Sequence, residues 1–459
     1  YVGIYSHGSP RLLLRDPELI KQITVKESNT FNAHTSFASE KVDPLWAKNL
    51  AALKGERWHD MRSTLTPAFT GSKLRMMFEL MKECAENLTN YFLKQEGTVT
   101  VELKDVFTRF ANDVIGTAAF GVTCNSFENR ENEFYLKGQE LSKTFIGINA
   151  IKFLFYIKIP KVMEILKVPV FPKSVSTFFR GLIQDTLKVR REKGIIRPDM
   201  VHLLMEAKQG RLEYIESDKA EDSGFAVTED YKLKKSQKDR KPVLTDEDIV
   251  SQALVFFSGG FDTTSTLMTF VSYELAANQE VQQKLREEVD AMLIENRGRL
   301  TYENVMKMKY LDMVVSETLR KWPPIAGTDR VSCRPFTIEP ELSGETSVLL
   351  ESGTSVAVPI FQIHKDPQYY PDPEKFDPER FNDENENNIK PFTYSPFGVG
   401  ARSCIGSRFA LLECKLIITQ IISKFEIIPV AQTQIPVEGY HDGFALITKR
   451  GAWVGLKPR

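Results

Sequence analysis

The chain has few cysteines and lacks a long apolar run. Its 459 residues include only five cysteines, and no two of them form a C-x-x-C pair. A disulfide scaffold and a thiolate zinc site are therefore not expected, and a reducing compartment is favoured. No stretch of about 18 uninterrupted apolar residues occurs, so the sequence predicts no membrane-spanning helix.

An excess of charge of one sign is also missing. Sixty basic side chains stand against 61 acidic ones, which indicates no general affinity for nucleic acid. No internal repeat and no signal peptide are evident. The chain begins at Tyr1 with YVGIYSHGSPRLLL, a pattern typical of a strand pair. We therefore expect the interior of a longer protein, with any targeting segment outside this sequence.

Apolar residues, in contrast, are abundant: 42% of the chain is hydrophobic, and 30 residues are Phe. That content supports a large buried core. We expect a single, mainly α domain over 1–459 with a smaller β-rich portion. The helical portion is predicted over 46–329 and 405–423, with long helices at 245–278 and 310–321. The β-rich portion is predicted from 1–45, 330–365 (including strand-like pieces over 336–363) and strands near the C-terminus. A short helix is also predicted at 17–27, within the first of these segments. The charge-dense segment 209–242 is predicted to be an exposed, mobile connection.

One cysteine has unusual surroundings. In PFGVGARSCIGSRFALLECK (396–415), Cys404 directly precedes a predicted helix that is apolar on nearly every side. Unpaired N–H groups and the positive end of the helix dipole favour an anion there, which predicts a lowered pKa for this thiol. Gly398, Gly400 and Gly406 let backbone amides approach the sulfur and leave room for a flat group. The residues alone leave two readings equally open: a metal-binding thiolate, or a buried free cysteine in a glycine-rich turn.

The spacing Phe397-x-x-Gly400-x-Arg402-x-Cys404-x-Gly406 resembles the haem-binding signature of the cytochrome P450 family at every fixed position. The resemblance implies that haem b is the cofactor and that Cys404 is the thiolate ligand of its iron. Phe397 would pack near the thiolate, and Arg402 would meet a haem propionate. The resemblance also places Gly398 and Gly406 beside the cofactor.

The long helix predicted from 245 has an unusual middle, SGGFDTTST (258–266). Each glycine costs about 1 kcal/mol relative to alanine, and Ser and Thr hydroxyls compete for backbone carbonyls, so local distortion is expected. Considered alone, the glycines are best explained by close packing against another helix. The run from Gly259 and Gly260 through Asp262 and Thr263 nevertheless resembles the family's oxygen-activation motif. The resemblance implies room for dioxygen at the glycines, a hydrogen bond to it from Thr263, and proton relay by Asp262.

Two charged motifs complete the resemblance in the helical portion. Glu317 and Arg320 share one helix face, which by itself indicates an ordinary surface ion pair. Together with PEKFDPERF, which contains Arg380, they resemble the family's buried Glu–Arg–Arg network, whose role is structural. His364 also lies in a segment, QIHKDP, that resembles the family, and we assign it no ligand role.

A second set of residues resembles the family's haem-propionate clamp. Trp58 and Arg62 lie one helical turn apart, which alone indicates an amphipathic pair. In the family both reach haem propionates, as does a basic residue at the position of Arg330. With Arg402, three guanidinium groups would hold two carboxylates.

The resemblance covers nearly the whole chain and is closest to microsomal P450s, especially insect xenobiotic-metabolising families. It implies a monooxygenase that acts on a lipophilic small molecule with electrons from NADPH through NADPH-cytochrome P450 reductase. It also implies a full-length protein on the cytoplasmic face of the endoplasmic reticulum membrane. Substrate contacts are expected within 31–53, 255–259, 325–328 and 443–444, and these positions fit an ordinary core equally well. The individual candidates are Val255, Ser258, Ile325, Ala326 and Phe444.

Two surface hypotheses accompany this interpretation. The segment 151–172 alternates aliphatic residues with lysines, and it either covers the core or contacts a membrane surface near the substrate entrance. A docking patch for an acidic reductase is predicted from basic residues on the thiolate side. These residues are Arg57, Lys73, Arg75, Arg408 and Lys415.

Two alternative functions stay open at this stage. One is a haem-thiolate isomerase or dehydratase that works without a reductase. The other is a haem-binding sensor that performs no chemistry. The paired Asp262 and Thr263 argue against both, because dioxygen activation is the step that needs an acid and an alcohol together.

Overall fold

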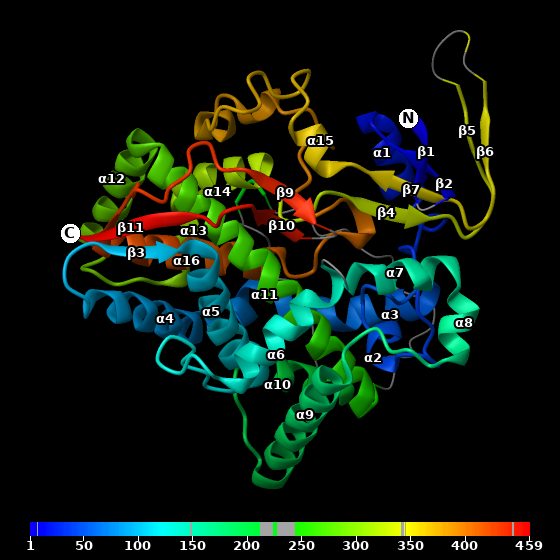
Figure 1. Ribbon diagram of the computed structural model, residues 1–459, viewed down its shortest axis with the longest axis horizontal. Coiled ribbons are helices and arrows are strands. Elements are labelled where there is room, and N and C mark those ends of the chain that lie inside the picture. Colours follow the sequence, from blue (N-terminus) through cyan, green and yellow to red (C-terminus); the bar gives the residue numbers. More distant parts are fainter. Residues whose placement is uncertain are drawn as a thin grey trace.

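The computed structural model (Figure 1) describes residues 1–6, 8–146, 149–211, 224–226, 244–340, 344, 346–442 and 445–459. The predicted connection 209–242 therefore lies largely outside the described residues. Described helices outnumber strands, which confirms a mainly α fold with a smaller β portion. The helices are α1 (Pro17–Lys21), α2 (Pro44–Ala47), α3 (Gly55–Leu65), α4 (Gly71–Leu93), α5 (Leu103–Ile115), α6 (Glu133–Ser142), α7 (Asn149–Lys158), α8 (Pro160–Ile165), α9 (Lys173–Lys193), α10 (Met200–Lys208), α11 (Asp246–Ala277), α12 (Gln279–Glu295), α13 (Tyr302–Lys307), α14 (Lys309–Lys321), α15 (Ile360–His364) and α16 (Ser407–Lys424).

The strands come from both ends of the chain, as the sequence predicts. Parallel pairing of β2 with β7 places residue 11 opposite residue 355, and β1 and β2 form the expected hairpin. The sheets have the orders β1-β2-β7-β4, β3-β11-β8, β5-β6 and β9-β10. The strands are β1 (Val2–Ser6), β2 (Ser9–Leu13), β3 (Val99–Glu102), β4 (Thr328–Val331), β5 (Phe336–Ile338), β6 (Val348–Leu350), β7 (Ser355–Val358), β8 (Phe425–Ile428), β9 (Gly439–Asp442), β10 (Ala445–Thr448) and β11 (Trp453–Pro458).

Helix α11 runs through the middle of the molecule (Figure 1) and packs against α2, α5, α14 and α16. Its 32 residues span about 48 Å. Thr245 and Asp248 form a capping box: Asp248 N donates to Thr245 Oγ1, and Thr245 N donates to Asp248 Oδ2. The helix therefore has a fixed start, and it carries its glycine pair to the centre of the fold.

Several individual helices and strands differ from the predicted helical and β-rich portions. Residues 360–364 form α15 and not a strand, because the chain turns at Pro359 after β7. The short helix predicted over 17–27 is confirmed by α1, which Asp16 caps with Pro17 at its first position. The unexpected helix in this segment is α2, which begins at Pro44 and is capped by Asp43. Helix α12 was not anticipated as a separate element, and β3 interrupts the helical portion.

Candidate active site

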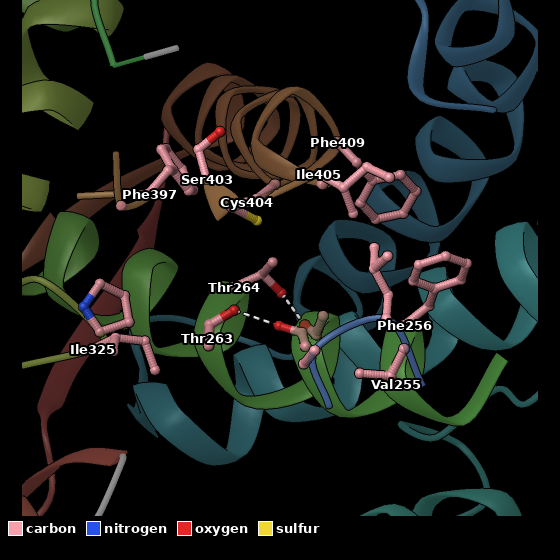
Figure 2. Close-up of a pocket in the computed structure, with 18 of the residues that line it drawn as sticks. Val255, Phe256, Thr263, Thr264, Ile325, Phe397, Ser403, Cys404, Ile405 and Phe409 are labelled. Carbon is pink, nitrogen blue, oxygen red and sulfur yellow. Dashed lines mark hydrogen bonds between the residues drawn. The ribbon is translucent and has the colours of Figure 1, made fainter. Parts of the chain in front are cut away.

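A cavity of about 490 Å³ separates the middle of α11 from the N-terminal end of α16, a volume within the range of small-molecule sites. In Figure 2 the sulfur of Cys404 faces Thr263 and Thr264 across this space. Val255, Phe256 and Ile325 contribute apolar walls. The cavity thus has the thiol of Cys404 on one side, the hydroxyl residues Thr263 and Thr264 opposite it, and mostly apolar surroundings.

The loop before α16 holds Cys404 in place. Cys404 N donates to Phe397 O at 2.8 Å, and the N–H of Gly406 hydrogen-bonds the sulfur. Gly398 and Gly400 have φ values of +75° and +69°, which favour glycine. A Cβ at Gly400 would lie 2.1 Å from Thr24 O, so close approach also requires glycine there.

The predicted lowering of the Cys404 pKa is wrong for the thiol in this protein environment. Burial raises its pKa, and the N–H of Gly406 and the charge of Arg62 offset that only in part. The Cys404 side chain is exposed to the cavity, but the surrounding protein separates it from bulk solvent. Burial therefore governs the ionisation of the thiol. A stable thiolate at this position needs a cation in the cavity, such as a metal ion.

Cationic side chains gather at one end of the cavity. Arg402 stacks on Trp58 with its guanidinium 4.0 Å from the ring centroid, and Arg62 Nη1 donates to Ser403 O at 2.8 Å. Burial, with Arg330 and Arg62 nearby, lowers the pKa of Arg402 to about 8. An anion between these guanidinium groups would relieve their repulsion.

Arg330 does not line the cavity. It is buried and donates from Nη2 to Val399 O at 2.8 Å. Its neighbour Asp329 accepts hydrogen bonds from Thr35 N at 2.9 Å and contacts His34 Nδ1 at 2.9 Å. His34 lines the cavity, and burial lowers its pKa, which favours the neutral form. No local motif indicated the contact between His34 and Asp329, because these residues lie 295 positions apart.

The glycines of α11 serve two different purposes. A Cβ added at Gly259 would meet nothing within 4 Å, whereas one at Gly260 would lie 3.0 Å from Ile115. The hydroxyls of Thr263 and Thr264 donate to the carbonyl oxygens of Gly259 and Gly260 (Figure 2). The helix continues through this region, so the expected distortion does not break it, although the predicted competition for carbonyls is present.

Asp262 does not line the cavity; it forms an ion pair with Lys104 of α5. Lys104 Nζ lies 2.7 Å from Asp262 Oδ1 and donates to the hydroxyls of Ser265 at 2.9 Å and Thr266 at 2.7 Å. Both partners are partly exposed, so the pair connects α11 to solvent on the side away from the cavity. The sequence analysis missed Lys104, because it lies 158 positions from its partner.

Glu317 and Arg320 are fully buried and bidentate, with Nε–Oε2 and Nη2–Oε1 distances of 2.7 and 2.8 Å. Arg380 Nε lies 3.6 Å from Glu317 Oε1, and Asp377 N donates to the same oxygen at 2.9 Å. Arg320 also donates to the carbonyl of His364. Burial and the Arg320 guanidinium lower the pKa of the His364 imidazole to about 3. The surface-pair interpretation is therefore excluded, and His364 serves as a neutral acceptor for Ser395 N.

The expected substrate residues separate into three groups. Val255 and Ile325 line the cavity, Ser258 and Ala326 do not, and Phe444 lies outside the described residues. Sequence analysis missed other apolar wall residues, because their positions follow from packing and not from a local motif. These are Phe69, Ile115, Ala119, Met200 and Leu267, whereas Phe256 lies within the predicted range 255–259.

The residues around the cavity fit a haem group. A thiol opens into the cavity from one wall, and two arginines and a tryptophan stand where a pair of carboxylates would be held. The remaining lining is mostly apolar, as an aromatic macrocycle requires. Among the described residues, no group of three or more His, Cys, Asp or Glu side chains offers a different metal site.

Comparison with known proteins agrees with this geometry. A family model described as Cytochrome P450 matches residues 1–454. The chain is 45% identical to cytochrome P450 9e2 of Blattella germanica, over all of this chain and 86% of that protein. It is 42% identical to probable cytochrome P450 9f2 and 36% identical to probable cytochrome P450 6a13, both of Drosophila melanogaster, over all of this chain and 86% and 85% of those proteins. The chain therefore belongs to the cytochrome P450 family of haem-dependent monooxygenases.

Proposed function

We propose that this monooxygenase inserts one oxygen atom into a lipophilic small molecule, with electrons from NADPH delivered by NADPH-cytochrome P450 reductase. The observation that carries the proposal is the position of Cys404 directly across an apolar cavity from Thr263 (Figure 2). Neither an isomerase nor a sensor needs the open space at Gly259 together with a hydroxyl and a nearby acid.

Each part of the cavity has a separate task in this proposal. Cys404 would hold the iron, while Arg62, Arg402 and Trp58 would hold the propionates. Bound haem supplies the redox chemistry of dioxygen, which protein side chains lack. The walls around Val255 and Ile325 exclude water and orient an apolar molecule, which is consistent with a lipophilic substrate.

Thr263 and Asp262 would handle protons from opposite sides of α11. The Thr263 hydroxyl lies at the cavity, whereas Asp262 is held towards solvent by Lys104. A proton taken up at Asp262 therefore reaches Thr263 only when the carboxyl leaves Lys104.

Replacing Thr263 with valine should leave haem content unchanged, because the shapes are similar and Thr263 donates only to its own helix. The product formed per NADPH consumed should fall about tenfold or more, because loss of a positioned proton donor has effects of this size. Peroxide release and product formation measured together would test this. Unchanged coupling would show that Thr263 has no role in proton supply.

The substrate class is best tested by spin-shift titration of the purified protein with lipophilic toxins, steroids and fatty acids. Ligands that displace water from the cavity should convert the iron to high spin and also stimulate NADPH consumption with the reductase. If no lipophilic compound shifts the spectrum while polar compounds do, the proposed substrate class is wrong.

The predicted reductase patch is smaller than the sequence indicated. Lys415 is fully buried and pairs with Asp312 at 2.6 Å, so it does not belong to any surface. Arg57 and Arg75 pair with acidic groups at 3.3 and 2.6 Å, which reduces their free charge. Lys73 and Arg408 are partly exposed, and we keep them as the proposed contact for an acidic reductase.

We also propose that α7 and α8 contact the cytoplasmic face of the endoplasmic reticulum membrane. Phe155 of α7, Ile165 of α8 and Leu166, which directly follows α8, are exposed, together with other aliphatic residues. Phe171 is buried and does not belong to this surface, contrary to the initial hypothesis. Within the described residues, no helix has the length and apolarity needed to span a bilayer.

Liposome flotation tests the membrane proposal. The double variant Ile165→Ser and Leu166→Ser should reduce the fraction of protein bound to anionic vesicles, because it removes exposed apolar area at the end of α8. Ile294→Ser is a matched control, since Ile294 is 80% exposed, compared with 78% for Ile165, and lies on distant α12. Equal flotation of the double variant and the control would reject this contact surface.

A further inference from the structure

Glu413 is a fully buried carboxyl group in α16. Among the described residues, neither of its oxygens accepts a hydrogen bond of normal geometry. The other buried acids in the described chain have partners. Asp199 pairs with Arg190, Glu317 with Arg320 and Glu274 with Lys321, and Asp43 accepts hydrogen bonds from three backbone N–H groups. Glu413 is therefore an exception that an ordinary ion pair does not explain.

The polar group next to Glu413 is the hydroxyl of Thr264 on α11. This hydroxyl has only one hydrogen, and it donates that hydrogen to Gly260 O. Thr264 Oγ1 can then only accept from the carboxyl group. A hydrogen bond between the two side chains consequently requires that the hydrogen belongs to Glu413.

The charges around Glu413 also favour a neutral carboxyl group. The titratable groups that interact with it are Cys84 of α4 and the adjacent Cys414, and neither supplies positive charge. The next residue, Lys415, is engaged by Asp312 at 2.6 Å. Burial raises the pKa of Glu413 well above its ordinary value, because an ionised carboxylate would be desolvated without a cation.

We propose that Glu413 is a neutral carboxylic acid in the folded protein and that it donates its hydrogen to Thr264 Oγ1. The resulting chain runs from Glu413 through Thr264 to Gly260 O. It connects α16, which follows the Cys404 loop, to the α11 turn on the opposite side of the cavity. Glu413 is thus a positioning residue: it fixes the Thr264 hydroxyl and the carbonyl of Gly260, both of which border the cavity.

Infrared difference spectroscopy of the purified haem-loaded protein tests the protonation state directly. At pH 7 the wild type minus Glu413→Gln spectrum should contain the C=O stretch of a protonated carboxyl group. In Thr264→Val that band should remain and shift to higher frequency, because its hydrogen-bond acceptor is lost. A carboxylate band in place of the acid band would overturn the proposal. If Glu413→Gln does not fold, the shift of the acid C=O band between wild type and Thr264→Val still shows whether Glu413 is protonated and bonded to Thr264.

The pH dependence of unfolding gives a second test. Because folding raises the Glu413 pKa, the native state holds a proton that the unfolded chain releases above about pH 4.3. Wild-type stability should therefore fall relative to Glu413→Gln as pH rises from 5 to 7. The ratio of their unfolding equilibrium constants should change about tenfold per pH unit. Glu79→Gln, at an exposed glutamate on α4, should show no such trend. Parallel pH profiles for wild type and Glu413→Gln would contradict a buried neutral acid.

The positioning role has its own readout. Glu413→Gln keeps a donor for Thr264, whereas Glu413→Met has a similar shape and no donor. Product formed per NADPH should be retained in the first variant and fall severalfold in the second. Equal coupling in both would refute the positioning role. The coupling measurement rests on the proposed function, but the infrared and stability tests do not. Failure of the proposed function can therefore be distinguished from failure of the Glu413 proposal. A wild type that shows the acid band but no turnover would count against the proposed function alone.

Discussion

Replacing Glu317 with glutamine is expected to destabilise the folded protein by about 3–5 kcal/mol, because it leaves the buried charge of Arg320 without its carboxylate. The pair is bidentate at 2.7 and 2.8 Å, both side chains are fully buried, and Asp377 N and Arg380 converge on the same carboxylate. Glutamine preserves the shape, so the effect measures charge rather than a packing defect. Urea unfolding followed by circular dichroism measures this change in the free energy of unfolding.

The chain offers a matched control with the same spacing. Glu79 and Lys82 also lie three residues apart in a helix, but Glu79 is 71% exposed. Glu79→Gln should change stability by less than about 1 kcal/mol. If Glu317→Gln changed stability as little as this control, the Glu317–Arg320–Arg380 network would not be needed to hold the segment before Cys404 in place.

Replacing Cys404 with serine is expected to abolish monooxygenase turnover while leaving the fold intact. A serine hydroxyl stays neutral at pH 7, whereas a thiol can lose its proton to become the ligand of a metal ion. The loop conformation depends on Gly398 and Gly400 and on the bond from Cys404 N to Phe397 O, none of which involves the sulfur. Product formation and thermal unfolding, measured together, separate loss of chemistry from loss of structure.

Cys333→Ser is the control for this substitution. Cys333 is an exposed cysteine whose thiol donates to Asn29 O, and it is not among the residues that line the cavity. Turnover should be unchanged in this variant. Residual turnover in Cys404→Ser at the wild-type level would mean that another group supports the reaction.

Local sequence patterns indicated which residues of the site lie together, and the resemblance to the family supplied their expected roles. The Cys404 loop, the Trp58–Arg62 pair and the Glu317–Arg320 pair each lie within one short segment, so spacing alone indicated a shared face or turn. The capping box at Thr245 was predictable for the same reason. Fold class followed from long helical patterns and from strand patterns at both ends of the chain.

Contacts between distant segments were not predictable in this way. Lys104 reaches Asp262, and Asp329 reaches His34, only because separate elements pack together. Lys415 looked like a surface charge, but it lies inside the core. The ionisation of Cys404 also differed from expectation, because burial outweighs the helix dipole, and burial is a tertiary property.

The carbon monoxide complex of the reduced protein tests the central claim most directly. If the sulfur of Cys404 is bonded to haem iron as a thiolate, the main absorption band should be strongly red-shifted from that of histidine-ligated haem proteins. The shifted band should disappear in Cys404→Ser and persist in Cys333→Ser. A wild-type band at the ordinary position, or a shifted band that survives in Cys404→Ser, would contradict the account.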